Sequence, residues 1–241
     1  MIRVGPAGWS YEDWEGIVYP PKKGPKFDPL AYLADFFDTI ELNNTFYRPP
    51  TPQMSKSWAN RVQANPRFKF TAKIYRNFTH ERQALTEADE GAFKSGIMPL
   101  MEGQRLGALL LQFPYSFHNN EANQAYLKTL AGKFREYPLV LEVRHASWDR
   151  ASAYQLLRDI HVGFCNIDQP VIGRSLKPSE RATARVAYVR LHGRRYDSWF
   201  SDDPALPPSE RYNYLSTEQE LEPWAARIRH LSEAGDSTFV I

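Results

Sequence analysis

The stretch Leu139-Val-Leu-Glu-Val-Arg-His-Ala-Ser-Trp148 indicates the fold more clearly than any other part of the chain. In an extended strand successive side chains point to opposite faces, so Glu142 and Arg144 share one face and positions 139, 141 and 143 form an apolar face. This pattern is typical of an α/β barrel, whose outer face packs on helices while the inner face opens into a site at the carboxyl ends of the strands.

Outward from this stretch, apolar runs alternate with amphipathic segments that carry helix-capping signals. Strands are expected near residues 2–7, 39–43, 67–73, 106–113, 138–144, 161–168, 186–192 and 237–241. Helices are expected near residues 29–37, 52–64, 86–101, 121–134, 149–159 and 217–234. Asp28-Pro29 and Thr51-Pro52 place a capping side chain before a proline, and Thr217 with Glu220 fits a capping box. The proline-interrupted segment 169–185 predicts a short helix or none.

Eight strands alternating with helices predict a mainly parallel sheet with right-handed crossovers. Closure into a TIM-like (β/α) barrel is favoured over an open nucleotide-binding sheet, because Gly5-Pro-Ala-Gly8 runs into Trp-Ser-Tyr and not into a helix. We expect one barrel-like domain over residues 1–241. The sequence stops at Ile241, at the eighth strand, so the final helix is absent. We therefore expect a chain truncated after strand eight, or a seam covered by another element such as a neighbouring subunit.

Composition narrows the class of protein. The 241 residues have a formal net charge of +2, which gives no strong electrostatic case for nucleic acid or an anionic membrane. The single cysteine excludes an internal disulfide and a thiolate-rich zinc site. No signal peptide pattern begins the chain, and no apolar run approaches the ~20 residues that span a bilayer. A cytoplasmic protein without membrane association is expected.

The alternation rule places many polar side chains on the inner face, in the C-terminal halves of the strands. These residues are Glu41, Asn43, Lys73, Gln112, Glu142, Arg144, Asp168, Arg190 and His192. Barrel active sites are built there from several strands at once, so the residues predict one pocket. The alternative is that Glu41 with Lys73, and Glu142 with an arginine, are internal ion pairs that only fill the barrel.

Several kinds of chemistry fit these residues. Glu41 and Glu142 are the candidate acid/base pair and His192 is a candidate proton carrier, which makes these three the catalytic candidates. Lys73, Arg144 and Arg190 suit an anionic ligand, because guanidinium groups bind phosphate and carboxylate bidentately. Asn43, Gln112 and Asp168 complete the polar binding set. The alternative is a metal bound by His192 or His145 together with the acidic residues Glu41, Glu142 and Asp168. No His-Glu-x-x-His spacing occurs, so this alternative is disfavoured and no metal is predicted. No cofactor is predicted either.

Aromatic side chains follow several expected strands, Trp9 and Tyr47 among them. On loops at the mouth of a barrel they would stack on a sugar or a base, so both are candidate binding residues. The alternative is that these rings cap the apolar core.

Six motifs carry a resemblance to a known family. They are Gly8-Trp-Ser-Tyr11, Ile40-Glu-Leu-Asn-Asn-Thr-Phe-Tyr-Arg48, Phe68-Lys-Phe-Thr-Ala-Lys73, Leu111-Gln-Phe-Pro114, Leu141-Glu-Val-Arg-His-Ala-Ser-Trp148 and Tyr188-Val-Arg-Leu-His-Gly193. In this order they resemble the YecE-like proteins, the family catalogued as domain of unknown function 72, over essentially the whole chain. The resemblance implies a TIM-barrel-like fold, and it implies no particular activity, cofactor or catalytic residue. Family members usually continue past the eighth strand with a Phe-Asn-Asn segment and a final helix.

Three functional hypotheses follow. The leading one is an enzyme or ligand-binding barrel that acts on a small anionic or sugar-phosphate-like substrate by acid/base chemistry at the C-terminal face. The second is a nucleic-acid or phosphodiester-binding protein, or a metal-dependent hydrolase, which the near-neutral charge disfavours. The third is a non-catalytic module that binds a metabolite or a protein partner. An uncovered C-terminal seam would also allow an oligomer. Whether the chain is an enzyme stays open.

Overall fold

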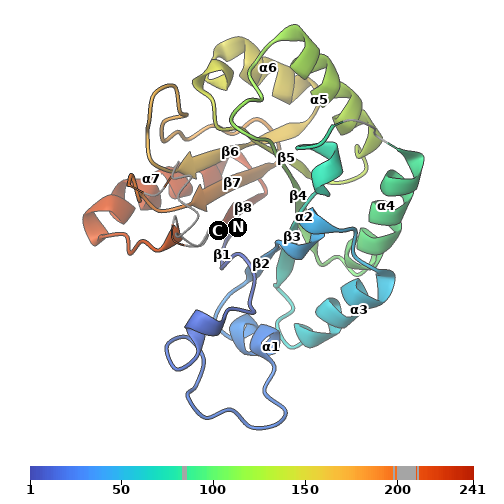
Figure 1. Cartoon of the computed structure of the whole chain (residues 1–241), viewed down its shortest axis with the longest axis vertical. Helices are drawn as coiled ribbons and strands as arrows, with labels where there is room; N and C mark the ends of the chain where they lie inside the picture. The colour runs from blue at the N-terminus through green and yellow to red at the C-terminus, as the bar shows by residue number, and fades with distance from the viewer. Residues whose placement is uncertain (83–85, 198, 200–209, 211) are drawn as a thin grey trace. The chain divides into compact units, whose positions relative to one another are not determined.

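The computed structural model describes residues 1–82, 86–197, 199, 210 and 212–241 (Figure 1). Its strands are β1 (Ile2–Val4), β2 (Thr39–Leu42), β3 (Lys69–Lys73), β4 (Leu106–Gln112), β5 (Leu139–Glu142), β6 (Val162–Asp168), β7 (Val186–Leu191) and β8 (Ser237–Val240). They form an eight-stranded sheet in the order β1-β8-β7-β6-β5-β4-β3-β2. Each expected strand is present, and the predicted TIM-like α/β barrel fold class is confirmed.

The helices are α1 (Pro29–Ala34), α2 (Asn44–Tyr47), α3 (Pro52–Arg61), α4 (Glu87–Glu102), α5 (Glu121–Lys133), α6 (Ala151–Asp159) and α7 (Glu218–Ala234). Short 3₁₀ turns lie at Glu12–Trp14, Arg76–Phe78 and Ala146–Trp148. All six predicted helices are confirmed. The four-residue α2 escaped prediction because a single turn is too short to show a helical period. Residues 169–185 contain no helix, as expected.

The capping signals define the helix starts. Asp28 accepts hydrogen bonds from the N–H groups of Leu30 and Ala31 at the start of α1. Thr51 accepts one from Met54 at the start of α3. The Thr217–Glu220 capping box is present at the start of α7. Each side chain satisfies backbone donors that the first turn of a helix leaves without partners.

The chain divides into two compact units, and the first consists of Arg3–Leu110 with Ile241. Within it β2, β3 and β4 pair in parallel. The backbone that follows β1 pairs with β2, since the Gly8 N–H donates to the Glu41 carbonyl (2.9 Å) and the Glu41 N–H to that of Pro6 (3.0 Å). Helices α3 and α4 lie side by side (Figure 1).

The second unit consists of Met1–Ile2 with Leu111–Val240. Strands β5 to β8 pair in parallel here. Trp224 and Leu231 of α7 pack with Ala187 and Val189 of β7 and with Val240 of β8 in one apolar cluster. Burial of this face positions α7 over the last two strands. The part of β7 that carries Arg190 therefore rests on a packed core.

Over the described residues, no helix has both the length and the apolar character that crossing a membrane requires. In β1 the side chains of Ile2 and Val4 are exposed while Arg3 is buried. The single-domain boundary, the truncation and the oligomer at the seam stay predictions.

Candidate functional site

The densest polar cluster of the Leu111–Val240 unit surrounds Glu142, the last residue of β5, whose side chain is completely buried. Among the residues that the structure describes, four side chains reach its carboxylate: Arg144 Nη2 at 2.6 Å, Arg190 Nη1 at 2.8 Å, Gln112 Nε2 at 3.0 Å and His192 Nε2 at 3.3 Å. We call Glu142 with these four residues the Glu142 cluster. All five were predicted to share one face at the strand ends, and the structure brings them together.

Arg144 lies two residues beyond the end of β5, where the backbone is held by the loop between β6 and β7. The Leu176 N–H donates to the Arg144 carbonyl at 2.7 Å. The Arg144 Nη1 donates to Gln169 Oε1 at 2.7 Å, and its guanidinium lies over the Trp199 ring at 5.7 Å. A carboxylate, an amide and an aromatic face therefore fix one guanidinium in place.

Arg190 and His192 reach the same carboxylate because they are two residues apart along an extended backbone, which places both on one face. Arg190 belongs to β7, and His192 follows its end. The His192 N–H donates to the Asp168 carbonyl at 2.9 Å, so the strand pairing with β6 continues through this residue. The rings of Trp199 and Tyr212 lie 6.0 and 6.2 Å from the imidazole.

Burial and charge set the protonation states in the cluster. Burial alone would raise the pKa of Glu142, but the positive charges of Arg144 and Arg190 hold that pKa well below its ordinary value. Burial, followed by the charges of the same two arginines, lowers the pKa of His192 to about 3, although Glu142 opposes this shift. At neutral pH the cluster therefore holds one carboxylate, two guanidinium groups and a neutral imidazole.

The neutral imidazole has a defined orientation. Arg190 Nη1 lies 2.8 Å from Glu142 Oε2 and 3.5 Å from His192 Nε2, so its hydrogen bond goes to the carboxylate. His192 Nε2 then carries the proton and donates to Glu142 Oε1. This leaves Nδ1 as the nitrogen that can accept a proton. A carboxylate that fixes the tautomer of a base is a recurrent arrangement in acid/base catalysis.

A second ionic group in the same unit surrounds Arg194. Its Nε contacts both carboxylate oxygens of Asp168, at 3.0 and 3.2 Å, and its Nη1 lies 3.3 Å from Glu220 Oε1. The Tyr214 hydroxyl donates to the same Glu220 oxygen at 2.5 Å. Asp168 is thus engaged by Arg194, and its carboxylate belongs to this group and not to the Glu142 cluster.

The remaining predicted residues lie in the Arg3–Leu110 unit. Lys73 Nζ lies 3.7 Å from the buried Glu41 carboxylate and 6.0 Å from the centroid of the Phe46 ring. Asn43 precedes α2, and its buried Oδ1 has no hydrogen-bond partner among the described residues. Tyr47 is exposed and its ring meets that of Phe46 at 5.2 Å.

Trp9, which was predicted to stack on a ligand or to cap the apolar core, contacts two residues of α3. Its ring meets that of Trp58 edge-on at 6.2 Å, and the Arg61 guanidinium lies over it at 5.6 Å. Both contacts fix the loop after β1 to α3. The role of Trp9 in ligand binding stays a prediction.

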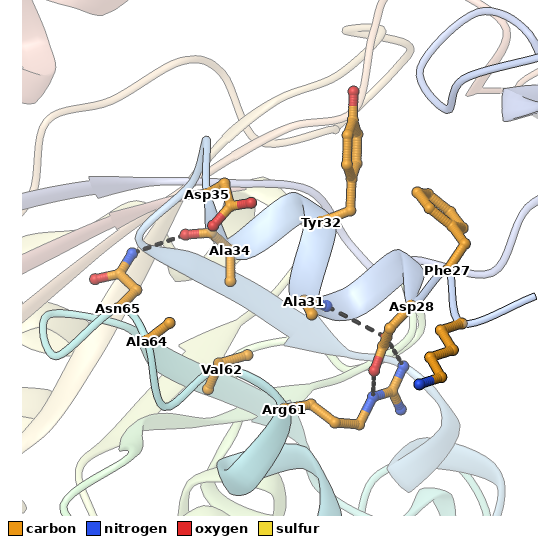
Figure 2. A pocket seen from close by; sticks show the side chains of 11 residues that line it. Phe27, Asp28, Ala31, Tyr32, Ala34, Asp35, Arg61, Val62, Ala64 and Asn65 are labelled. Carbon is orange, nitrogen blue, oxygen red and sulfur yellow. Dashed lines mark hydrogen bonds and ion pairs between the residues drawn. The ribbon is translucent and has the colours of Figure 1, made fainter. Parts of the chain in front are cut away.

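A cavity of about 310 Å³ lies between α1 and the end of α3 (Figure 2). Three of its polar side chains, Asp28, Arg61 and Asn65, make hydrogen bonds with one another or with nearby groups. Arg61 binds Asp28 with Nε at 2.7 Å and Nη2 at 2.5 Å, and the Asn65 amide donates to the Ala34 carbonyl at 3.0 Å (Figure 2). These contacts join α1 to α3, and none of the predicted site residues lines this cavity.

Sequence reasoning did not single out three residues that support the clusters. Gln169 follows β6 and binds Arg144, although strict alternation would turn it away from Asp168. Glu220 was expected only as a helix cap, yet it also binds Arg194, and Tyr214 binds Glu220. Backbone turns beyond the strand ends create these contacts, so period-two alternation could not reveal them. Over the described residues, no three His, Cys, Asp or Glu side chains gather as a metal site would require.

Comparison with known proteins agrees with the sequence motifs. The model of the family described as "Protein of unknown function DUF72" matches residues 3–241. The UPF0759 protein YunF of Bacillus subtilis is 30% identical over an alignment that covers all of this chain and 88% of that protein. The UPF0759 protein YecE of Escherichia coli K12 is also 30% identical, over 60% of this chain and 49% of its own length.

Solved structures match over the whole chain. A DUF72 protein of Thermotoga maritima, TM1631, is 34% identical with a TM-score of 0.84, and the match covers 91% of it. A DUF72 protein of Enterococcus faecalis, EF0366, has a TM-score of 0.85 at 23% identity over 88% of its length, which speaks for the fold alone. The family model and the relatives agree in sequence and in fold: the chain belongs to the DUF72 family.

Proposed function

We propose that the chain binds a small anionic substrate beside Arg144 and transfers a proton with His192 as general base. The observation that carries this proposal is the partly exposed guanidinium of Arg144, which Glu142 and Gln169 hold in place beside the Trp199 ring. A guanidinium that is fixed in this way and still has unused donors favours the binding of an anion. A carboxylate or phosphate group is the matching ligand.

Arg144 is the residue that would meet the ligand. Its side chain is 16% exposed, against 7% for Arg190 and none for Glu142, so it is the guanidinium nearest to solvent. Glu142 and Gln169 hold one nitrogen each, at Nη2 and Nη1. A guanidinium has five N–H donors, so donors remain for a ligand. Trp199 supplies an apolar face beside them.

Binding of an anion would also switch on the base. The arginine charges contribute to the low pKa of His192, so a ligand that neutralises Arg144 would raise that pKa. A base whose pKa rises towards neutrality in the complex accepts a proton more effectively. Glu142 would then orient His192 and stabilise its protonated form. This differs from the acid/base role expected of Glu142, because a carboxylate whose pKa is well below its ordinary value is a poor proton donor.

Thermal-shift titration with formate tests the anion site. We expect stabilisation of the wild type that is lost in Arg144→Ala and partly kept in Arg144→Lys, since lysine keeps the charge but not the bidentate fork. Arg229→Ala serves as the matched control, because Arg229 is an exposed arginine of α7. Equal stabilisation of wild type and Arg144→Ala by formate would refute the proposed site.

A further inference from the structure

A second cationic site lies at the start of α6, within the Leu111–Val240 unit. A cavity of about 660 Å³ opens there, lined by Arg150, Arg158 and Arg181 together with Ser152 and Gln155. None of these residues belongs to the Glu142 cluster. The size is within the range of pockets that hold small organic ligands, roughly 300–1,000 Å³.

The three arginines have no acidic partner. In the described part of the chain none of them forms an ion pair with a carboxylate, whereas Arg144, Arg190 and Arg194 all do. Arg158 donates a hydrogen bond to an uncharged group, Gln155 Oε1, at 3.4 Å. Three guanidinium groups therefore line one cavity, and none of them is in an ion pair with a carboxylate of the described residues.

The cavity is also lined by one carboxylate, that of Asp149, which accepts a hydrogen bond from another lining residue. The Tyr154 hydroxyl donates to Asp149 Oδ1 at 2.6 Å. The Arg181 guanidinium lies over the Tyr154 ring at 5.2 Å, so the buried tyrosine supports both side chains. With Asp149 counted as one negative charge, the lining keeps an excess of two positive charges.

Arg181 is held by a buried polar residue of β6. Asn166 is completely buried, its Oδ1 accepts from the Arg181 N–H at 2.7 Å, and its Nδ2 donates to the Arg181 carbonyl at 3.1 Å. A polar side chain in the middle of an otherwise apolar strand thus fixes the backbone of a lining residue. This contact explains why β6 carries an asparagine where packing alone would favour an apolar side chain.

The start of α6 adds donors of the same kind. Arg150 is the N-cap, and its side chain makes no capping bond. The N–H groups of Ala151 and Ser152 have no acceptor among the described residues. A helix N-terminus with unused N–H groups favours an anion, which reinforces the charge of the three arginines.

We infer that this cavity binds the phosphate group of a small phosphorylated molecule. Guanidinium forks and free backbone N–H groups are the donors that recognise phosphate oxygens, and a phosphate alone would leave most of the cavity for an organic part. The phosphodiester backbone of a nucleic acid would need an extended basic surface, whereas the whole chain has a net charge of +2.

Calorimetric titration of the full chain at constant ionic strength tests this inference. The probes are inorganic phosphate, glycerol phosphate and a short single-stranded DNA. We expect the two phosphate compounds to bind, and Arg158→Ala and Arg181→Ala each to weaken binding about tenfold. The control Arg229→Ala removes an exposed arginine outside the cavity and should change the affinity less than twofold. Because Arg158 and Arg181 are exposed, circular dichroism should show wild-type folding in both variants.

The outcomes separate this site from the one beside Arg144. The inference would be overturned if Arg144→Ala abolished phosphate binding while Arg158→Ala left it intact. It would also be overturned if the control Arg229→Ala weakened phosphate binding as much as Arg158→Ala does. Binding of DNA without binding of either phosphate compound would also overturn it. Binding that Arg158→Ala and Arg181→Ala weaken, with Arg144→Ala unaffected, would establish the cavity as a separate phosphate site.

Discussion

Substitution of Glu142 by glutamine is the sharpest perturbation of the candidate site. Glutamine keeps the size of the side chain and one acceptor oxygen, but it removes the charge that two guanidinium groups share at 2.6 and 2.8 Å. Removing one partner from a buried charged group costs about 3–5 kcal/mol, because the remaining charges stay buried without compensation. We expect Glu142→Gln to lower the free energy of unfolding by about this amount.

Urea denaturation at pH 7, followed by circular dichroism, measures the effect. Glu222→Gln is the matched control, since Glu222 is exposed on α7 and should change stability by less than about 0.5 kcal/mol. A decrease in the free energy of unfolding of less than about 1 kcal/mol would refute the claim that Glu142 neutralises the guanidinium groups of Arg144 and Arg190.

The pH dependence gives an independent signature of the same residue. The pKa of Glu142 is lowered by folding, so its stabilising contribution is complete above the ordinary carboxyl pKa and disappears as the pH falls through the lower, folded value. The difference between wild type and Glu142→Gln should therefore hold at pH 5 to 7 and shrink only at more acidic pH.

Three further predictions concern single residues. The pKa of His192 is lowered to about 3 in the folded protein, so the wild type should lose stability as the pH falls below 6.5. The expected loss is roughly 2 kcal/mol at pH 5. Urea denaturation of His192→Gln at pH 7 and pH 5 should not show this loss. Thr217→Ala removes the α7 capping box and should cost about 1 kcal/mol in the same assay, while an unchanged midpoint would show that α7 does not depend on it. Gly163→Ala would place a Cβ 2.6 Å from the Val186 carbonyl oxygen. Thermal unfolding should therefore show a free energy of unfolding that is lower by about 1–3 kcal/mol. A variant as stable as the wild type would mean that β6 and β7 can separate locally.

The sequence predicts the fold well because its signals are local and strong. Buried parallel strands are almost continuously apolar, as in Leu106–Gln112, and helix starts carry side chains such as Thr51 that have a direct physical task. Strand alternation also identifies the Glu142 cluster, since Arg190 and His192 are two residues apart on one strand end.

The pairing within the site is harder to predict, because it depends on the loops beyond the strands. Asp168 ends a strand as expected, but Arg194 reaches it from a segment whose turns have no period, and Glu220 binds Arg194 and not Asp168. Arg144 is held by Gln169 for the same reason. Protonation states also require the assembled cluster, since burial and neighbouring charges act together on His192.

The ¹⁵N chemical shifts of the His192 ring between pH 3 and 8, with and without formate, test the central claim most directly. The account predicts a neutral ring with the proton on Nε2 down to about pH 3, and a pKa that rises when formate binds to the wild type but not to Arg144→Ala. A ring that titrates near 6.5 and ignores formate would contradict it.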